Sequence, residues 1–409
     1  MNILFLSDNF PPEVNAPALR THEHCMEWVN QGANVTVITC FPNFPKGKIY
    51  PGYKNKLYQK EEIDGIKVIR VWSFMSENKG FLMRTLDFIS YAFMALVFGL
   101  FQKFDVVIGT SPQFFTAISA RLIAFFRFKK WIMEVRDLWP ETIAAVGAMN
   151  THSFSYRLLE KIEKHLYKSS KIIIVNAEGI KNSINQKGIK ESKIKVIKNG
   201  VIVKDYLNFS PNKRLREKHN LIDYKLITYI GTIGMCHALN FILNCFQNLK
   251  DSKIHLLIIG DGAEKDNLML QAEKLKLENI TFLPSIKKEL VNEYINISDV
   301  ALVNLKKSDT FQKIIPSKIF ENVAMKKPIL LGVEGEAKDL IEKYNVGVCY
   351  EPENEDSFHK ALNKIIQNGN NRMSFNKACE NMMNDFDRTK LAIRMLDIIT
   401  YECCNNNTK

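Results

Sequence analysis

The chain of 409 residues has no long apolar run of the kind that crosses a bilayer. A spanning helix needs ~20 consecutive apolar residues, whereas the apolar segment Phe88–Phe101 has only 14. The opening segment Met1–Leu6 has no basic region before it and ends at Ser7, so a secretory leader is not expected. These absences predict a cytoplasmic protein without a membrane-spanning helix.

Motifs for metals, common cofactors and nucleic acid are also missing. The eight cysteines form no C-x-x-C pair, and the single D-x-D, Asp385–Asp387, adjoins the last predicted helix rather than a strand end. Neither a phosphate-binding Gly-Lys-Ser/Thr loop nor a three-glycine dinucleotide fingerprint follows any predicted strand. No zinc-finger, helix-turn-helix or RNA-binding pattern accompanies the basic residues. The sequence therefore predicts reduced thiols, no metal, no bound cofactor and no nucleic-acid partner.

Basic residues are concentrated in the first half of the chain. Residues 1–199 carry 27 Lys and Arg against 17 Asp and Glu, while the remainder carries 29 against 27. The segment Phe114–Trp131 combines several phenylalanines with four basic side chains, which is typical of a helix lying in lipid headgroups. The alternative is that it and Phe88–Phe101 are core helices of an α/β domain with a basic outer edge.

Short β-branched runs alternate with helical patterns along the whole chain. Several runs are continuously apolar, which is typical of strands buried on both faces of a parallel sheet. In the first half they are residues 3–6, 35–39, 68–71, 106–109, 131–135 and 172–175; in the second half they are 226–230, 254–259, 280–283, 300–303 and 329–331. The pattern predicts two Rossmann-like α/β domains, 1–199 and 200–388, with a last helix at 389–404 that could pack back on the first.

The strongest candidate site in the second half is Pro316-Ser317-Lys318, followed by Glu321. Proline suits a first helical turn, which would place the Ser317 and Lys318 N–H groups and the Lys318 ammonium where an anion is favoured. Glu321 lies three residues further on a neighbouring helical position, where it could meet a ribose diol. The alternative is an ordinary surface ion pair between Lys318 and Glu321.

Two glycine turns follow predicted strands of the same half, where ligands bind in open α/β sheets. Their residues include Gly231, Thr232, Gly234, Gly260, Asp261 and Gly262. Neither turn is specific by itself, but both predict close backbone approach to a ligand.

The first half offers a charged cluster and a proline-containing loop after predicted strands. Arg136 could bind an acceptor phosphate, and Asp137 or Glu141 could accept a proton from an acceptor hydroxyl. The loop Asp8–Arg20 forms another candidate wall, with Asn15 and Arg20 as acceptor contacts. Both regions could instead be salt-bridged structural loops.

In this order the motifs resemble the family 4 glycosyltransferases of the GT-B fold, in which two Rossmann-like domains face each other across a cleft. The resemblance spans essentially the whole chain. It is carried by residues 8–20, 40–47, 136–141 (RDLWPE), 199–201, 231–234, 260–262 and 316–321 (PSKIFE). The subgroup most similar includes N-acetyl-L-fucosamine transferases of bacterial O-antigen and capsule synthesis.

The resemblance implies retaining transfer without a metal, from a UDP-sugar on the second domain to an undecaprenyl-diphosphate-linked saccharide on the first, at the inner membrane surface. It places Glu321 at the ribose. The family's first glutamate of its E-x7-E motif is replaced here by Lys313, so that Gln312, Phe311 or the neighbouring backbone would contact the sugar. The family's basic pair after the glycine turn is also absent, and Lys318 is the candidate to replace its charge.

Two other functions fit the same architecture. A UDP-sugar 2-epimerase of this fold would act without an acceptor, and would have no need of an apolar, basic first domain. A non-catalytic sugar-nucleotide-binding partner would bind the donor without turnover, a reading suggested by Lys313.

Overall fold

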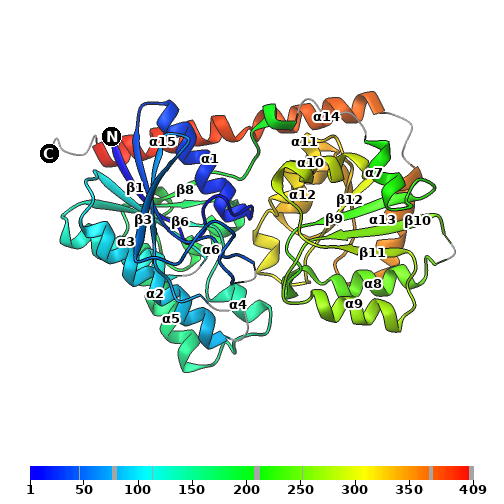
Figure 1. Cartoon of the computed structure of the whole chain (residues 1–409), viewed down its shortest axis with the longest axis horizontal. Coiled ribbons are helices and arrows are strands. Elements are labelled where there is room, and N and C mark those ends of the chain that lie inside the picture. The colour runs from blue at the N-terminus through cyan, green and yellow to red at the C-terminus, as the bar shows by residue number, and fades with distance from the viewer. Residues whose placement is uncertain are drawn as a thin grey trace. The chain divides into compact units, whose positions relative to one another are not determined.

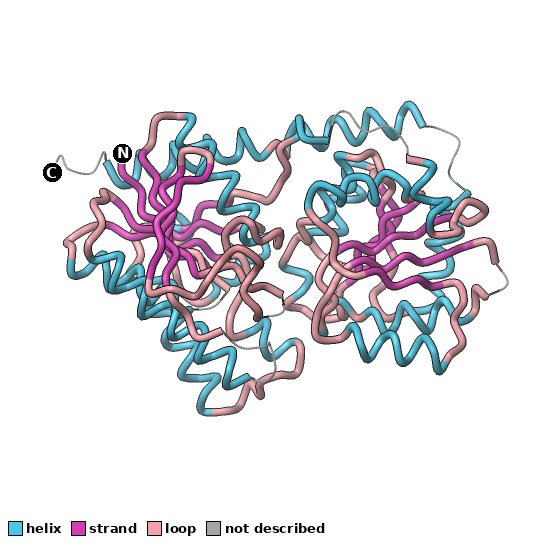
Figure 2. The backbone as a smooth tube through the Cα atoms, viewed as in Figure 1, coloured by secondary structure: helices cyan, strands magenta, loops and turns pink. Residues whose placement is uncertain are grey.

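The computed structural model describes residues 1–45, 47–75, 81–112, 114–206, 212–250, 252–367 and 372–404. The chain forms two compact units: unit 1 comprises Met1–Asn199 with Arg388–Lys409, and unit 2 comprises Gly200–Asp387. In each unit a twisted sheet lies between layers of helices (Figures 1 and 2). This is the arrangement expected when apolar strands are covered on both faces.

Unit 1 contains an eight-stranded sheet in the order β3-β4-β2-β1-β5-β6-β7-β8, parallel except for the β3–β4 hairpin. Its strands are β1 (Asn2–Leu6), β2 (Asn34–Cys40), β3 (Tyr58–Ile63), β4 (Ile66–Val71), β5 (Val106–Thr110), β6 (Lys130–Val135), β7 (Ile172–Val175) and β8 (Ile194–Val196). The strand order reverses direction between β1 and β5. Open α/β sheets bind ligands at the carboxyl ends of the strands at such a switch point.

The helices of unit 1 cover both faces of this sheet (Figure 1). They are α1 (Ala16–Asn30), α2 (Phe81–Leu100), α3 (Phe114–Phe126), α4 (Glu141–Ala145), α5 (Phe154–Ser169), α6 (Glu178–Gln186), the 3-10 turn η1 (Glu191–Lys193) and α15 (Arg388–Cys404). Helix α15 packs on α1, where the Trp28 indole donates to the Ala392 carbonyl at 2.9 Å. Arg388 pairs with Glu23 at 2.5 Å. Helix α15 is therefore part of the first unit's core.

Helix α2 differs from the sequence-based expectation. The helix begins at Phe81, before the charge-free run, and ends at Leu100, and its window Met83–Leu100 is long and apolar enough to cross a membrane by length and composition. Arg84 and Asp87 lie in its first turns, and only 28% of the window is buried. The argument from the length of the charge-free run therefore underestimated the helix.

Unit 2 contains a six-stranded parallel sheet in the order β11-β10-β9-β12-β13-β14. Its strands are β9 (Lys225–Ile230), β10 (Ile254–Ile259), β11 (Ile280–Leu283), β12 (Val300–Asn304), β13 (Ile329–Gly332) and β14 (Gly347–Cys349). Its helices are α7 (Lys213–Lys218), α8 (Leu239–Gln247), α9 (Lys265–Lys274), α10 (Lys288–Ile297), α11 (Lys318–Ala324), α12 (Glu336–Tyr344), α13 (Glu355–Gln367) and α14 (Arg372–Asp385), with 3-10 turns η2 (Val203–Tyr206), η3 (Met235–His237) and η4 (Phe311–Lys313). Its switch point lies between β9 and β12.

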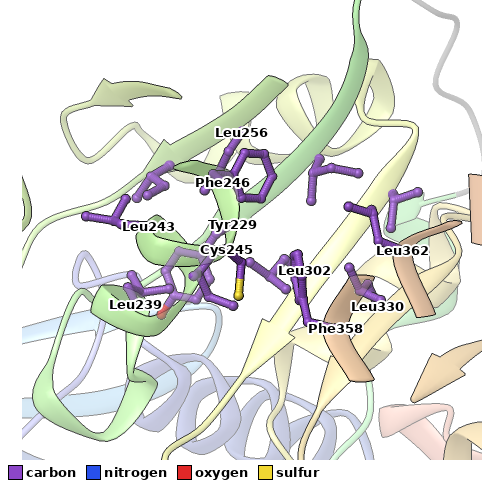
Figure 3. Packing of buried hydrophobic residues seen from close by; sticks show 14 of the residues in the cluster. Tyr229, Leu239, Leu243, Cys245, Phe246, Leu256, Leu302, Leu330, Phe358 and Leu362 are labelled. Carbon is purple, nitrogen blue, oxygen red and sulfur yellow. The ribbon is translucent and has the colours of Figure 1, made fainter. Parts of the chain in front are cut away.

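A hydrophobic cluster fixes the strands of unit 2 against α8 and α13 (Figure 3). Phe246 and Phe358 pack 6.2 Å apart between ring centroids, and Tyr350 meets Phe358 edge-on at 5.2 Å. Leu302 and Leu330 extend the cluster onto the central strands. Burial of such side chains stabilises the fold by about 1.5–3 kcal/mol each, so the loops at the strand ends project from a rigid base.

Candidate functional site

The two glycine turns of unit 2 interlock at the carboxyl ends of the neighbouring strands β9 and β10. The Gly231 N–H donates to the Ile259 carbonyl at 2.9 Å, and the Ile233 N–H donates to the Asp261 carbonyl at 2.9 Å. Gly260 has φ +154°, and a Cβ there would lie 1.9 Å from the Gly231 carbonyl oxygen. Only glycine permits this approach, so the predicted turns are one preformed backbone structure.

Lys318 reaches this structure from the start of α11. Its ammonium nitrogen lies 3.7 Å from the centroid of the Tyr229 ring, and 3.1 Å from where a Cβ on Gly231 would stand. The nitrogen is buried and has no hydrogen-bond partner among the described residues. Burial lowers the pKa of Lys318 to about 8. A buried, unsatisfied cation beside a glycine turn is a destabilising arrangement that a bound anion would relieve.

Tyr229 and His237 complete the surroundings of the Lys318 ammonium, and neither residue was predicted from the sequence to take part in a site. The Tyr229 hydroxyl donates to the Thr232 carbonyl at 2.6 Å, which fixes the ring under the ammonium. The His237 Nδ1 accepts from the Gly234 N–H at 3.3 Å. Burial, together with the Lys318 charge, lowers the pKa of His237 to about 3. His237 is therefore neutral and leaves Lys318 as the cation beneath the turn.

The switch point between β9 and β12 closes around the same turn. Asn304, at the end of β12, donates to the His237 carbonyl at 2.8 Å and accepts from the Tyr350 hydroxyl at 2.7 Å. The Lys306 N–H donates to the Cys236 carbonyl at 2.8 Å. The loops after the two strands at the switch point thus support one another, as this topology favours.

The helix that carries Lys318 begins later than predicted. Helix α11 has seven residues, Lys318–Ala324, with Ser317 at its N-cap and Pro316 before it. The Pro316 carbonyl accepts from the Ile319 N–H at 3.2 Å, and the Ser317 carbonyl accepts from the Phe320 N–H at 3.1 Å. A helix does begin at this motif as predicted, but Pro316 lies before its N-cap rather than in its first turn. The positive charge at this place therefore comes from the Lys318 side chain, while Glu321 lies within α11 and its charge acts on Lys318.

Gln312 and Lys313 lie in η4, which packs against the loop before α12. The Gln312 amide donates to Glu334 at 3.3 Å, and a Cβ on Gly335 would lie 2.3 Å from the Gln312 carbonyl oxygen. Lys313 is half-buried. Their contact with a sugar stays a prediction.

In unit 1, Arg136 is held in place just beyond β6. Its Nε and Nη2 both donate to the Ser111 carbonyl, at 2.9 and 2.6 Å, and Ser111 follows β5. Its Nη1 is buried and has no partner among the described residues. Burial raises the pKa of the neighbouring Asp137, and the Arg136 charge offsets part of that rise. Arg136 thus keeps one donor group unused at the carboxyl end of the sheet.

The predicted base Glu141 is engaged in a salt bridge. Lys187 pairs with Glu141 at 2.9 Å and with Glu163 at 2.6 Å, which ties α4 to α5 and α6. This is the structural alternative that the sequence left open for the cluster. A catalytic role for Glu141 stays a prediction.

Arg20 and Asn15 also have structural partners. Arg20 pairs with Glu134 at 2.9 Å and donates to the Ile197 and Lys198 carbonyls and the Asn199 side chain, so four of its five N–H groups are used. Asn15 caps α1 by accepting from the Ala18 N–H at 2.9 Å, and its amide donates to Asn9. The acceptor contacts proposed for both stay predictions.

A carboxyl group that sequence reasoning missed lies in the loop after β1. The Glu13 Oε1 accepts from the Asn43 and Phe44 N–H groups, both at 2.8 Å, while its Oε2 is buried with no partner among the described residues. Burial raises the pKa of Glu13 from 4.5 to about 7. The position of Glu13 in the sequence gives no indication of this raised pKa, because its burial comes from the packing of two loops that are distant in sequence.

No group of three or more His, Cys, Asp or Glu placed to hold a metal ion occurs among the described residues.

Two family models match the two halves of the chain. The model described as Glycosyltransferase Family 4 matches residues 18–205, and that described as Glycosyl transferases group 1 matches residues 211–382. A putative colanic acid biosynthesis glycosyl transferase, WcaI of Escherichia coli K12, is 24% identical over 378 residues, covering 90% of this chain and 92% of its own. The probable glycosyltransferase WbjE of Pseudomonas aeruginosa is 24% identical over 272 residues, covering 65% of this chain and 67% of its own.

Solved structures show the same fold. HepE of Anabaena, in complex with UDP-glucose, superposes with a TM-score of 0.74 at 14% identity, covering 98% of this chain and 99% of its own. The two α/β units are those of the GT-B fold, as the sequence predicted.

Proposed function

Since this chain is a glycosyltransferase of the GT-B fold, we propose that it transfers a sugar, with retention, from a UDP-sugar held by unit 2 to a lipid-linked saccharide held by unit 1. One observation carries the proposal: the buried Lys318 ammonium lies beside the interlocked glycine turns and has no hydrogen-bond partner in the part of the chain that the structure describes. A diphosphate is the group of a sugar nucleotide that this charge would satisfy. The UDP-glucose held by HepE supports the choice of donor.

Lys318 would act on the leaving group. As the bond from the sugar to the diphosphate breaks, negative charge develops on the departing oxygen. A preorganised cation lowers the barrier because no reorganisation is needed at that moment. We assign this charge to Lys318 in place of a metal ion, with the Gly231–Gly234 backbone beside it and Glu321 at the ribose.

Arg136 is the residue of unit 1 that we assign to the acceptor. Its Nη1 is buried without a described partner, whereas its other groups are fixed on Ser111. A guanidinium suits a phosphate oxygen of a diphosphate-linked acceptor. Asp137 is the candidate to receive the acceptor proton, because burial raises its pKa toward the range of a useful base.

We place this reaction in bacterial surface polysaccharide synthesis, either O-antigen or capsule. The similar proteins include one named for colanic acid biosynthesis and another for teichuronic acid biosynthesis. Resemblance of the RDLWPE and PSKIFE motifs makes N-acetyl-L-fucosamine the first sugar to test. An undecaprenyl-diphosphate-linked saccharide is the matching acceptor.

A lipid-bound acceptor calls for contact with the cytoplasmic face of the membrane. Helix α2 exposes Leu86 and Phe93, the latter 61% exposed, and the end of α3 exposes Phe126. Arg84 and Arg127 lie close by in sequence. Apolar side chains accompanied by cations bind an anionic bilayer surface, so we assign this face of unit 1 to the membrane.

The test is a turnover assay with a panel of nucleotide sugars, UDP-N-acetyl-L-fucosamine among them, and undecaprenyl-diphosphate saccharides. Nucleoside diphosphate release that depends on acceptor, with a matching gain in product mass, is the expected result. Formation of an epimerised sugar nucleotide without acceptor would show that the protein is an epimerase rather than a transferase. Donor binding without turnover across a panel of competent acceptors would contradict the proposal.

Membrane contact has its own test. The double variant Phe93→Ser with Phe126→Ser should reduce sedimentation with phosphatidylglycerol vesicles, because it removes two exposed rings. Phe154→Ser serves as control, since Phe154 is 81% exposed on α5 instead. Equal sedimentation of the double variant and the wild type would remove this surface from the account.

A further inference from the structure

A cavity of about 480 Å³ lies in unit 1 and is lined by five lysines and one carboxylate. The lysines are Lys168, Lys171, Lys190, Lys193 and Lys195, and the carboxylate is Glu402. Its volume falls within the ~300–1,000 Å³ range of small-molecule sites. It takes no part in the transfer reaction proposed above.

The cavity lies at the opposite end of the sheet from Arg136. Lys171 immediately precedes β7, and η1 with Lys193 immediately precedes β8, so both lie at the amino ends of parallel strands. Arg136 follows the carboxyl end of β6, the neighbour of β7. One four-residue strand separates its two ends by roughly 13 Å. The lysines therefore cannot be part of the acceptor site at Arg136.

The positive charge in the cavity exceeds what the surrounding protein offsets. Glu402, near the end of α15, lies 3.9 Å from the Lys171 ammonium and 3.4 Å from that of Lys195, so a single carboxylate faces both. Lys193 donates to the Lys168 carbonyl at 2.7 Å. The Lys168 carbonyl lies at the end of α5, where carbonyls lack helical partners and cations are favoured, so this bond is a helix-end contact. Among the lining residues, Glu402 is the one carboxylate that can offset the charge of the other lysines.

The lysines also disfavour one another. Burial lowers the pKa of Lys193, and the charge of Lys171 lowers it further. Like charges held together in a partly enclosed space raise the free energy of the protein until an anion neutralises them. A group with several negative oxygens would do so while accepting hydrogen bonds from more than one ammonium.

We propose that this lysine cavity is a second anion site, which binds phosphate groups at the end of unit 1 remote from the transfer reaction. Two sources supply that chemistry: the phosphate of an anionic lipid headgroup, or a free phosphate compound such as pyrophosphate. Ser192 adds a hydroxyl donor, and the Glu402 carboxylate restricts the site to ligands with enough charge to compete with it.

Lysine footprinting locates the binding directly. The wild-type protein, saturated with UDP to fill the donor site, is reductively methylated with and without pyrophosphate, and each lysine is quantified by mass spectrometry. We expect protection of Lys171, Lys190 and Lys195 by at least about threefold, and no protection of the exposed Lys60 and Lys67. A second arm replaces pyrophosphate with phosphatidylglycerol vesicles, and a third uses phosphatidylcholine vesicles as the uncharged control.

Variants give the matched test. Lys168→Gln with Lys190→Gln should weaken binding of the protecting anion by about tenfold or more, since one lysine near an anionic surface contributes a factor of about five. Lys60→Gln with Lys67→Gln changes the net charge equally on the β3–β4 hairpin and should leave binding unchanged. Glu402→Gln should tighten binding about twofold to fivefold, because it removes the competing carboxylate.

Each outcome decides the proposal. Protection by pyrophosphate identifies a free phosphate as sufficient, and protection by anionic vesicles alone identifies the lipid headgroup. Absence of protection in both arms, or equal weakening by the two lysine pairs, would overturn the site.

Discussion

Two buried cations, Arg20 in unit 1 and Lys318 in unit 2, show how the same kind of group can serve two different purposes. Arg20 pairs with Glu134 and fills four of its five N–H groups with partners in its own unit. Lys318 has a ring beneath it and no described hydrogen-bond partner. The comparison distinguishes a buried charge whose loss would leave a buried partner unpaired from one for which we propose a ligand.

Replacing each cation with methionine should lower stability in one case only. Arg20→Met leaves Glu134 buried without its partner, so the free energy of unfolding should fall by about 3–5 kcal/mol. Lys318→Met removes an unpaired buried charge and should leave stability unchanged or raised. Urea denaturation of both variants measures the contrast, and equal destabilisation would break it.

Glu13 extends the comparison to a buried carboxylate that is satisfied on one oxygen only. Its folded pKa of about 7 exceeds the unfolded value of 4.5, so the stability it contributes is complete below pH 4.5 and is lost as the pH rises to about 7. Glu13→Gln imitates the neutral form. Between pH 5 and pH 8, the free energy of unfolding of this variant should rise relative to that of the wild type by up to about 3 kcal/mol.

The same urea titrations, repeated across that pH range, measure the gain. Glu62→Gln, an exposed site on β3, is the control and should show no trend. A constant difference between Glu13→Gln and wild type at every pH would show that Glu13 does not titrate in this range.

Catalysis should depend on Lys318 far more than stability does. Lys318→Ala should lower turnover at least ~100-fold, comparable with the loss of one charge-stabilising donor elsewhere. Lys265→Ala is the control for the loss of a lysine with a structural role, because that ammonium donates to the Gly260 and Leu283 carbonyls. If Lys318→Ala kept near wild-type turnover in the acceptor assay, the proposed role would be lost.

The pH dependence of turnover should follow the same group. Because the Lys318 pKa is about 8 in the free protein, kcat/KM for the donor should fall as the pH rises through that value, by about tenfold per unit above it. Arginine stays charged there, so Lys318→Arg should abolish this decline while lowering the maximum. A decline retained in Lys318→Arg would assign it to another group.

The sequence predicted the sheets well because buried parallel strands are continuously apolar. It missed β3, whose residues Tyr58–Ile63 alternate in exposure at the sheet edge, and β14, which has only three residues. An edge strand carries polar side chains, so apolar runs do not reveal it. The sequence feature that does mark β3 is the Asp64-Gly65 pair, which forms the hairpin turn to β4 with φ +50° and +76°.

The candidate site was predictable only where a backbone motif marks it. Glycine turns and Pro-Ser-Lys are visible in the sequence, whereas Tyr229 and His237 join the site through packing between strands and turns. Burial raises the pKa of Glu13 against the opposing effect of the Asn43 N–H, which lies thirty residues away and donates to its carboxylate. Likewise, nothing in the spacing of Arg20 indicated that its guanidinium would bind Glu134, the Ile197 and Lys198 carbonyls and the Asn199 side chain.

The most direct test of the central claim compares the binding of UDP and of uridine by isothermal titration calorimetry, in the wild type and in Lys318→Met. If the Lys318 ammonium receives the donor diphosphate, the preference of the wild type for UDP over uridine should fall by about tenfold or more in the variant, because the charge-assisted contact is lost. Uridine itself should bind both proteins equally. An unchanged preference for UDP in Lys318→Met would contradict the account.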